Sequence, residues 1–415
     1  MTRQQKRSGA GGTPPRRRSP TLFVALAVVA GATLAGADPA DAATWTGVAP
    51  GVTYRHYDLA GAAGTAHAHV LGVDLADPRV RLGLLYPGVV AARATVSSLA
   101  ARQRAVAGVN GDFFDITETQ HPGVAATGAS VGPAVAGGMA LKGAVPDAQR
   151  FGPAPPPGTD TRAVVGVGVD GRARLDSLTL DGSYAVAGRR VPLGGVNQYA
   201  LPENSVGAYT SEWGGVSRRR ATCGSDTARA APCSTRTYEV TLRRGRVVSA
   251  SVTPGSGAIA AGSTVLVGRE AGAQRLKRLV TGQRVAVRYV LTSASRSVYR
   301  FAVGGFPILS GGRPLAGPDT SVSAVRTAVG VGDGGRRVFL FALDGAGPYR
   351  RGLTIAEVAA ALRRLGATEG FSLDGGGSST LVARPPGAAA GVTVRNHPSD
   401  GAERPVANGI GVFVG

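Results

Sequence analysis

The sequence predicts an α+β fold, in which a mixed β-sheet core carries a few packed helices and a β-rich inserted subdomain. The chain has 415 residues, of which 43% are hydrophobic and 17% charged, and this is enough apolar material for one large or two medium cores. It contains 63 glycines and 26 prolines without a collagen-like period, which is typical of many short strands and turns. We divide it into an N-terminal signal (1–43), a core domain in two parts (44–195 and 292–415) and the insert (196–291).

The first 43 residues have the pattern of an export signal. Three arginines, Arg16 to Arg18, precede an apolar run from Leu22 to Ala37, and small residues follow up to Ala43. An uncleaved membrane anchor is the alternative, but glycines interrupt the run and it is barely long enough to span a bilayer. We therefore expect a secreted, extracellular protein without stable membrane insertion after signal cleavage. Association with the cell wall is a further option.

The charge of the chain indicates the kind of partner. The formal net charge is +20, and nearly all of the basic residues are arginines. A basic exported protein concentrates near anionic polymers, so a phosphorylated glycan or wall polymer is the expected substrate or partner. No aromatic-interleaved basic stretch or DNA-binding motif occurs, and nucleic acid is not expected as a partner. The sequence does not indicate an oligomeric state.

Only two cysteines occur, Cys223 and Cys233, in a polar segment. Outside the reducing cytosol this spacing predicts a disulfide that closes a local loop, and a catalytic thiol is not expected.

The N-terminal part of the core domain should contain strands and one helix. Residues 67–86 alternate around Asp77 and Pro78 and predict two strands joined by a turn. Thr95 is placed to cap a helix over 96–104. The apolar run 105–109 predicts a buried strand that ends at Asn110.

Further along, residues 150–160 form a proline-rich loop, and two turn pairs predict β-hairpins. These pairs are Asp170-Gly171 and Asp181-Gly182. Within the insert we expect strands at 238–243, 247–252 and 284–291.

The clearest helix is expected over 355–365. Thr354 and Glu357 have the spacing of a capping box, and Gly366 suits the left-handed residue that ends a helix. Apolar runs at 338–343 and 371–373 flank it and should be strands of one sheet. Asp344 and Asp374 would then follow corresponding strand ends and lie beside each other.

The strongest chemical motif is a glycine-rich loop after Asp374. Three glycines let the backbone approach a ligand and turn amide groups toward it, and the serines add hydroxyl donors. The residues are Gly375, Gly376, Gly377, Ser378 and Ser379. A second element is Arg326 with Thr327, since a fixed guanidinium can bind a phosphate through two parallel hydrogen bonds.

Three other motifs are less informative. The glycine pattern at 166–171 precedes a strand-like segment where a dinucleotide site needs a helix. Ser130 lies in a nucleophile-elbow pattern, but the residues after it are poor helix formers. His67 and His69 share one strand face and could bind a metal, yet the sequence offers no clear third ligand.

Taken in order, the motifs of the chain resemble the phosphodiester glycosidase family. The residues that carry the resemblance are Asn110 to Phe114, Gly304 to Leu309, Arg326 to Val331, Asp344-Gly345, Leu373 to Ser379 and Arg404 to Gly409. The resemblance implies hydrolysis of the bond between a sugar C1 and a phosphate oxygen, which releases free sugar, with an N-acetylhexosamine as the expected sugar. It implies that Asp374, Asp344, Arg326 and Thr327 are catalytic, and that the substrate contacts Asn110, Asp112, the loop 375–379, Arg404 and Asn408.

The residues are compatible with such a reaction. A phosphate leaving group needs positive charge near it and negative charge near the sugar carbon, which Arg326 with Arg404 and Asp374 or Asp344 would supply. The favoured base or nucleophile is Asp374. We expect no required cofactor, and the presence of a divalent cation among the carboxylates is left open. The alternatives are a metal-dependent phosphodiesterase that uses Asp112, Asp344 and Asp374, and a non-catalytic module that binds anionic wall polymers.

Overall fold

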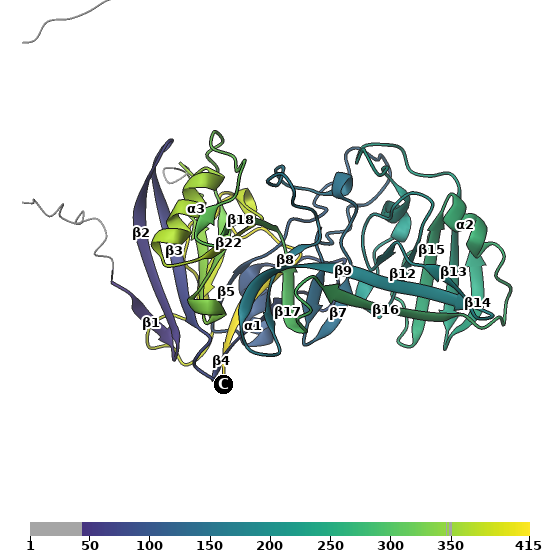
Figure 1. Cartoon of the computed structure of the whole chain (residues 1–415), viewed down its shortest axis with the longest axis horizontal. Helices are drawn as coiled ribbons and strands as arrows, with labels where there is room; N and C mark the ends of the chain where they lie inside the picture. The colour runs from purple at the N-terminus through teal and green to yellow at the C-terminus, as the bar shows by residue number, and fades with distance from the viewer. Residues whose placement is uncertain (1–43, 346, 348–350) are drawn as a thin grey trace, which may run out of the picture. The chain divides into compact units, whose positions relative to one another are not determined.

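The computed structural model describes residues 44–345, 347 and 351–415 (Figure 1). The predicted export signal lies outside the described residues. The described chain is mostly strand with few helices, arranged in four sheets, and this confirms the predicted α+β class. No helix among the described residues is long and apolar enough to cross a membrane.

The largest sheet has eight strands in the order β1-β2-β3-β21-β20-β22-β18-β19. Their bounds are β1 Thr46–Ala49, β2 Val52–Gly61, β3 Gly64–Asp74, β21 Arg337–Leu343, β20 Thr327–Gly332, β22 Glu369–Leu373, β18 Phe306–Ser310 and β19 Arg313–Pro314. All of its pairings are antiparallel.

A five-stranded sheet, β24-β23-β5-β25-β4, packs near the large sheet, with β5 in contact with β21. The strands are β24 Thr393–Val394, β23 Leu381–Ala383, β5 Ala107–Asn110, β25 Gly409–Val414 and β4 Val80–Leu85. Apolar side chains of both sheets, such as Val109, Ile410 and Phe371, belong to one core. The ends of strands from two sheets are thereby brought together, and the candidate site lies there.

Helix α3, Ile355–Arg364, covers the large sheet. Thr354 and Glu357 form the predicted capping box, so this helix start is confirmed. Gly330 and Gly370 pair across β20 and β22, and a Cβ at either would lie within 3.3 Å of Leu362. Glycine at both positions therefore lets the helix approach the sheet closely. Helix α1, Val96–Gln103, capped by Thr95 as predicted, contacts β4, β5 and β23.

Two further sheets carry the central part of the chain. One contains β10 Arg189–Pro192, β9 Ala173–Val186, β8 Ala163–Gly168, β17 Tyr299–Gly304, β6 Ala134–Ala136 and β7 Met139–Lys142, with β16 Ala286–Ser293 paired to β9. The other contains β11 Gly195–Val196, β12 Val206–Tyr209, β15 Ser263–Arg269, β13 Thr237–Arg243 and β14 Arg246–Ser251, covered by helix α2, Ala271–Leu276. The three predicted insert strands are present, whereas β12, β15 and α2 were not predicted. The domain boundaries stay a prediction.

The hairpin predicted at Asp181-Gly182 is wrong. Both residues lie inside the fourteen-residue strand β9 and pair with β16, and the chain turns instead at Ala187 and Gly188. Both turn residues have positive φ, 47° and 81°, which a tight two-residue hairpin requires. The Asp170-Gly171 hairpin joins β8 to β9 as predicted.

Candidate active site at the converging strand ends

Asn110, the last residue of β5, joins the ends of several strands. Its side chain is fully buried; Oδ1 accepts hydrogen bonds from Thr327 Oγ1 at 2.9 Å and from the Thr380 amide at 3.1 Å. Its Nδ2 donates to the Asp374 carbonyl at 2.7 Å. Thr327 Oγ1 also lies 3.0 Å from Ser379 Oγ. The structure thus brings these predicted residues together. Their side chains bond to one another and to the backbone, so they fix the positions of the strand ends that form the site.

Gly111 and Asn408 place the two central carboxylates. The amides of Gly111 and Asp112 donate to the backbone and side-chain oxygens of Asn408, each at 2.9 Å. A Cβ on Gly111 would lie 2.3 Å from Asn408 Oδ1, so only glycine fits this close approach. The Asp374 amide in turn donates to the Gly111 carbonyl at 2.9 Å. Asp112 and Asp374 are therefore anchored to the same short stretch of backbone.

Asp112 is a buried carboxylate with an incomplete set of partners. Its Oδ2 accepts from the Gly132 amide at 2.6 Å, whereas Oδ1 is buried without a hydrogen-bond partner among the described residues. Burial raises the pKa of Asp112 to about 6, although the charge of Lys142 opposes this rise. A buried carboxylate in this condition can hold a proton near neutral pH.

Lys142, which sequence reasoning missed, is the buried cation whose charge acts on Asp112. It is 1% exposed and donates to three backbone carbonyls, those of Val131 at 3.2 Å, Gly143 at 2.6 Å and Gly132. Burial lowers the pKa of Lys142 to about 7, against the opposing effect of Asp112. The chain has only three lysines among its 46 Lys and Arg residues, and a lysine at the end of an apolar strand was the available signal.

Asp374 follows β22 and is partly exposed. Its carboxyl group is surrounded by protein atoms, and this desolvation raises the pKa of Asp374 to about 7. Ser378, the Gly375 amide and Arg404 act to lower the pKa, and the Asp112 carboxylate acts to raise it. The group is therefore poised to exchange a proton near neutral pH, which is the requirement for acid–base work.

The glycine loop after Asp374 is more engaged with its own chain than the sequence suggested. The amides of Gly376, Ser378 and Ser379 donate to Val325, Gly375 and Gly376 carbonyls at 2.8–3.1 Å, and residues 376–378 form a 3-10 turn. Ser378 and Ser379 are buried, whereas Gly376 is exposed. A ligand would therefore meet mainly the glycine backbone of this loop.

Arg404 supplies the guanidinium beside the loop. A Cβ on Gly377 would lie 2.0 Å from Arg404 Nη2, so the side chain rests directly on that glycine. Nη2 also donates to Asp400 Oδ2 at 2.9 Å, and the Arg404 side chain is 32% exposed. Its charge is one of those that lower the pKa of Asp374. Arg404 is thus both near the carboxylate and accessible.

Arg326 has other contacts. Its Nε donates to the Leu353 carbonyl at 3.1 Å and its Nη2 to the Val322 carbonyl at 2.7 Å. Successive residues of a strand point to opposite faces, and Thr327 points toward Asn110. Arg326 consequently stabilises, through the Leu353 carbonyl, the segment that leads into α3. Its predicted role in binding phosphate stays a prediction, while Arg404 is the guanidinium that the structure places at Asp374.

Asp344 does not lie directly beside Asp374, contrary to the expectation from the strand–helix–strand pattern. Strand β20 runs between β21 and β22, antiparallel to both, so one strand separates the two carboxylates. Asp344 Oδ1 accepts from the His397 amide at 2.6 Å and lies 2.9 Å from His69 Nε2, and Oδ2 lies 3.0 Å from His397 Nδ1. Burial acts to raise the pKa of Asp344, but the hydrogen bonds with His69 and His397 bring it down to about 2.

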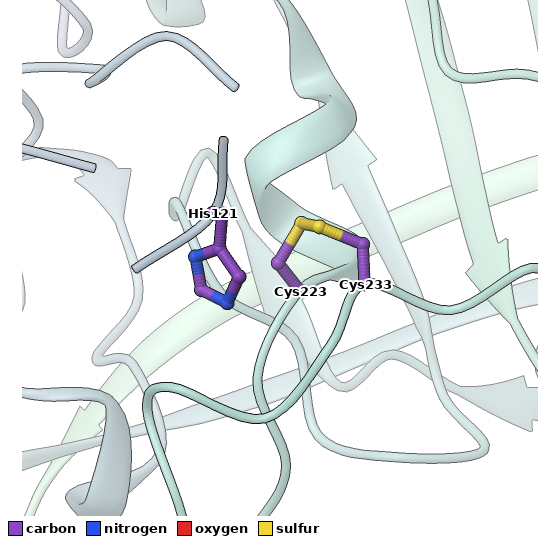
Figure 2. A group of neighbouring side chains, drawn as sticks. All are labelled: His121, Cys223 and Cys233. Atoms are coloured by element: carbon purple, nitrogen blue, oxygen red, sulfur yellow. A yellow bond between two sulfur atoms is a disulfide. The ribbon is translucent and has the colours of Figure 1, made fainter. Parts of the chain in front are cut away.

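The two cysteines form the predicted disulfide, with His121 beside it (Figure 2). His121 Nε2 lies 2.9 Å from the Ala231 carbonyl and its Nδ1 lies 2.5 Å from Glu118 Oε2, and Glu118 also pairs with Arg220. Within the described residues, His121 and the two cysteines are the one group of three His, Cys, Asp or Glu donor atoms that approach within 4.8 Å of one another. Because the sulfur atoms are bonded to each other, they are not available as metal ligands, and this group instead stabilises the disulfide loop.

Comparison with known proteins bears out the family resemblance. Residues 236–413 match the model of the phosphodiester glycosidase family. This region contains the glycine loop, Arg404 and Asn408, whereas Asn110 and Asp112 lie before it. A search of curated proteins gave no significant match.

Two of the solved structures that were compared with this chain have a similar fold. A hypothetical protein from Synechocystis has a TM-score of 0.68 and 19% identity over 90% of this chain and 64% of its own, so this chain spans less than two thirds of that protein. A structure described as an exported protein from Burkholderia pseudomallei has a TM-score of 0.63 and 24% identity over 86% and 76% of the two chains. The zebrafish N-acetylglucosamine-1-phosphodiester alpha-N-acetylglucosaminidase catalytic domain, auto-inhibited by its pro-peptide, gives a TM-score of 0.41 and 15% identity over 90% and 86%.

Proposed function

Because residues 236–413 match the phosphodiester glycosidase family, we propose that this protein hydrolyses the glycosidic bond of a sugar-1-phosphodiester. An N-acetylhexosamine is the proposed sugar, and the products are the free sugar and a phosphomonoester. The observation that carries the proposal is a group of two carboxylates, the buried Asp112 and the partly exposed Asp374, near an exposed glycine backbone and the guanidinium of Arg404.

The arrangement meets the demands of this reaction. The phosphate departs with the electron pair of the C1–O bond and needs little protonation, so the main requirement is positive charge near it. Arg404 at Gly377 supplies that charge. Asp374 accepts a proton from the attacking water as the water oxygen bonds to C1, or attacks C1 itself to form a glycosyl ester, which water then hydrolyses to free sugar and the Asp374 carboxylate. Asp112, which accepts a hydrogen bond from the Gly132 amide, raises the pKa of Asp374 and so makes it a stronger base.

The pH dependence of the rate tests the assignment of Asp374. Its carboxylate is the active form in this mechanism, and its pKa is raised to about 7, so kcat/KM should rise with pH through an apparent pKa near 7. Asp112→Asn removes a neighbouring negative charge, and the profile should then move to lower pH. A rate that falls as pH rises through 7 would remove Asp374 from the role of base.

The products of the reaction test the function itself. The full chain is incubated with a panel of sugar-1-phosphodiesters, and sugar and phosphate products are identified by mass. A free reducing sugar with a phosphomonoester supports the glycosidase. Sugar-1-phosphate would instead indicate a phosphodiesterase, and tight binding of wall polymer without any product would indicate a binding module. The phosphodiesterase with a metal among Asp112, Asp344 and Asp374 is less favoured, because β20 separates Asp344 from Asp374.

We also propose that the protein is exported and acts on a phosphorylated glycan or wall polymer. Support comes from the signal-like pattern of residues 1–43, the net charge of +20 and the Cys223–Cys233 disulfide, which suits an oxidising compartment. Detection of the disulfide-bonded chain, lacking its first residues, in culture medium or wall extracts would test this.

A further inference from the structure

A pocket lies on the large sheet at the end of β21 and is lined by most of the histidines of the chain. Its volume is about 310 Å³, at the lower end of the range for small-molecule sites. Four of the five histidines line it with two carboxylates, aromatic rings and a guanidinium: His56, His67, His69, His397, Asp58, Asp344, Tyr54, Tyr57, Ala68 and Arg395. We call this set the histidine pocket.

The register of β2 and β3 explains the gathering. His56 pairs with His69 and Asp58 pairs with His67 across the two antiparallel strands, and paired residues share one face of a sheet. Tyr54 lies two residues before His56 and so shares the same face. Residues far apart in the sequence, Asp344 and His397, complete the pocket from the end of β21 and from a later loop.

Hydrogen bonds hold the buried polar groups of the histidine pocket, His69 and Asp344, in fixed orientations. His69 is 6% exposed and lies between Tyr54 Oη, 2.7 Å from its Nδ1, and Asp344 Oδ1, 2.9 Å from its Nε2. His67 Nδ1 lies 2.6 Å from Asp58 Oδ1. Preorganised donors and acceptors of this kind are typical of a binding site.

Asp344 is suited to binding and not to proton transfer. It makes three hydrogen bonds, with the His69 ring and with the amide and ring of His397. A carboxylate so fully bonded is a weak base and a weak nucleophile, because any reaction must first break those bonds. Its place in the site is therefore that of a hydrogen-bond acceptor that orients its neighbours.

The chemistry of the lining narrows the ligand. An anion would face both Asp58 and Asp344, which disfavours a second phosphate. A metal ion needs three or more donor atoms close together, and the described residues of the histidine pocket do not bring three His or Asp donor atoms within 4.8 Å of one another. A neutral polyhydroxyl compound fits, because its hydroxyl groups can both donate to carboxylates and accept from ring N–H groups and Arg395.

The loop that follows Arg395 connects the histidine pocket to the glycine loop at Asp374. The Gly345 amide donates to the His397 carbonyl at 2.7 Å, and Ser399 Oγ donates to the Gly376 carbonyl at 3.2 Å. Arg404 then rests on Gly377. One continuous segment therefore lines both places, and it contacts the glycine loop at the exposed Gly376.

We propose that the histidine pocket binds the alcohol half of the phosphodiester, a sugar or similar polyhydroxyl group, while Asp374 and Asp112 act on the sugar that is released. This inference rests on the proposed function for the placement of the two halves. The phosphate then lies at the glycine backbone with Arg404, and Asp344 and His69 are positioning residues of the leaving-group subsite.

The test compares two substrates that differ only in the alcohol. Both are N-acetylglucosamine-1-phosphodiesters, one of methanol and one of the C6 hydroxyl of a methyl hexopyranoside. In Asp58→Ala and His67→Ala, KM for the pyranoside diester should rise about tenfold, whereas kcat/KM for the methyl diester should stay within about twofold of the original value. Thr65→Ala is the matched control, because Thr65 lies on the same face of β3 and outside the pocket.

Equal losses with both substrates would assign these residues a structural role, and unchanged kinetics with the pyranoside diester would show that the pocket is not the subsite. Calorimetric titration with methyl α-pyranosides of glucose, galactose and mannose provides an independent readout. At least one should bind the unaltered chain and Thr65→Ala, and not His67→Ala. If neither diester is hydrolysed, the proposed function fails, and the titration still decides whether the pocket binds a sugar. Binding of ZnCl₂ that depends on His67, without any pyranoside binding, would overturn the proposal in favour of a metal site.

Discussion

Replacing Asp374 by asparagine should lower the rate of sugar release by about 10²–10⁴-fold, the contribution expected of a positioned base. Asparagine keeps the size of the side chain but cannot take a proton from water or attack C1. The measurement is kcat/KM for a sugar-1-phosphodiester, followed by the appearance of free reducing sugar. Asp181→Asn, an exposed carboxylate in β9, is the control and should leave the rate unchanged.

The stability of the same variant separates a catalytic effect from damage to the fold. The pKa of Asp374 is raised to about 7 in the folded protein, above its ordinary value of 3.8, so folding favours the protonated form. The associated stability is present at low pH and is lost as pH rises through 7. Asparagine cannot ionise, so Asp374→Asn avoids the cost of keeping a charged carboxylate in the folded protein at high pH. Its melting temperature should equal that of the unaltered protein at pH 4 and be equal or higher at pH 8. Full activity in this variant would exclude Asp374 from the mechanism.

Replacing Lys142 by methionine should destabilise the protein by about 3–5 kcal/mol, the range for leaving a buried charge without the opposite charge that compensates it. Methionine fills similar space but leaves Asp112 without its cation and three backbone carbonyls without a donor. The free energy of unfolding is measured by urea denaturation at a pH between about 6 and 7. In this interval Asp112, with a pKa raised to about 6, is largely ionised, and Lys142, with a pKa lowered to about 7, still carries its charge.

A double-mutant cycle identifies the cause of this loss. Adding Asp112→Asn to Lys142→Met removes the uncompensated charge, so the double variant should be less destabilised than the sum of the two single variants. Additive losses would mean that Lys142 acts through the carbonyls alone. Lys277→Met, at the exposed end of α2, loses an ammonium group 5.9 Å from the Tyr238 ring centroid and should change the stability by less than about 1 kcal/mol.

The elements that depend on local contacts could be predicted from the sequence. The start of α3 follows from Thr354 and Glu357, because a capping box involves only four consecutive residues and its hydrogen bonds form within them. The same holds for Thr95 at α1 and for the tight disulfide between Cys223 and Cys233, whose loop closes over a short stretch of chain. For such features, the sequence separation of the interacting groups is small.

Predictions failed where a distant partner decided the outcome. Asp181 and Gly182 favour a turn, but pairing with Val290 and Tyr289 of β16, more than a hundred residues later, keeps them in a strand. Turn propensity is a weak local preference, and a row of hydrogen bonds to a neighbouring strand outweighs it. The neighbours of Asp344 and Asp374 depend in the same way on β20, which pairs between their strands.

The sequence by itself determined the α+β class, the capped helices, the disulfide and the set of motifs that resemble a phosphodiester glycosidase. Only the tertiary structure decided which of these motif residues meet. It placed Lys142 where its charge acts on Asp112, placed Arg404 where its charge acts on Asp374, and put Asp344 in the histidine pocket. The physical reason is that burial, pKa and the pairing of charges depend on groups that fold together from distant parts of the chain, and strand order, which sets those neighbours, is not written in any single segment.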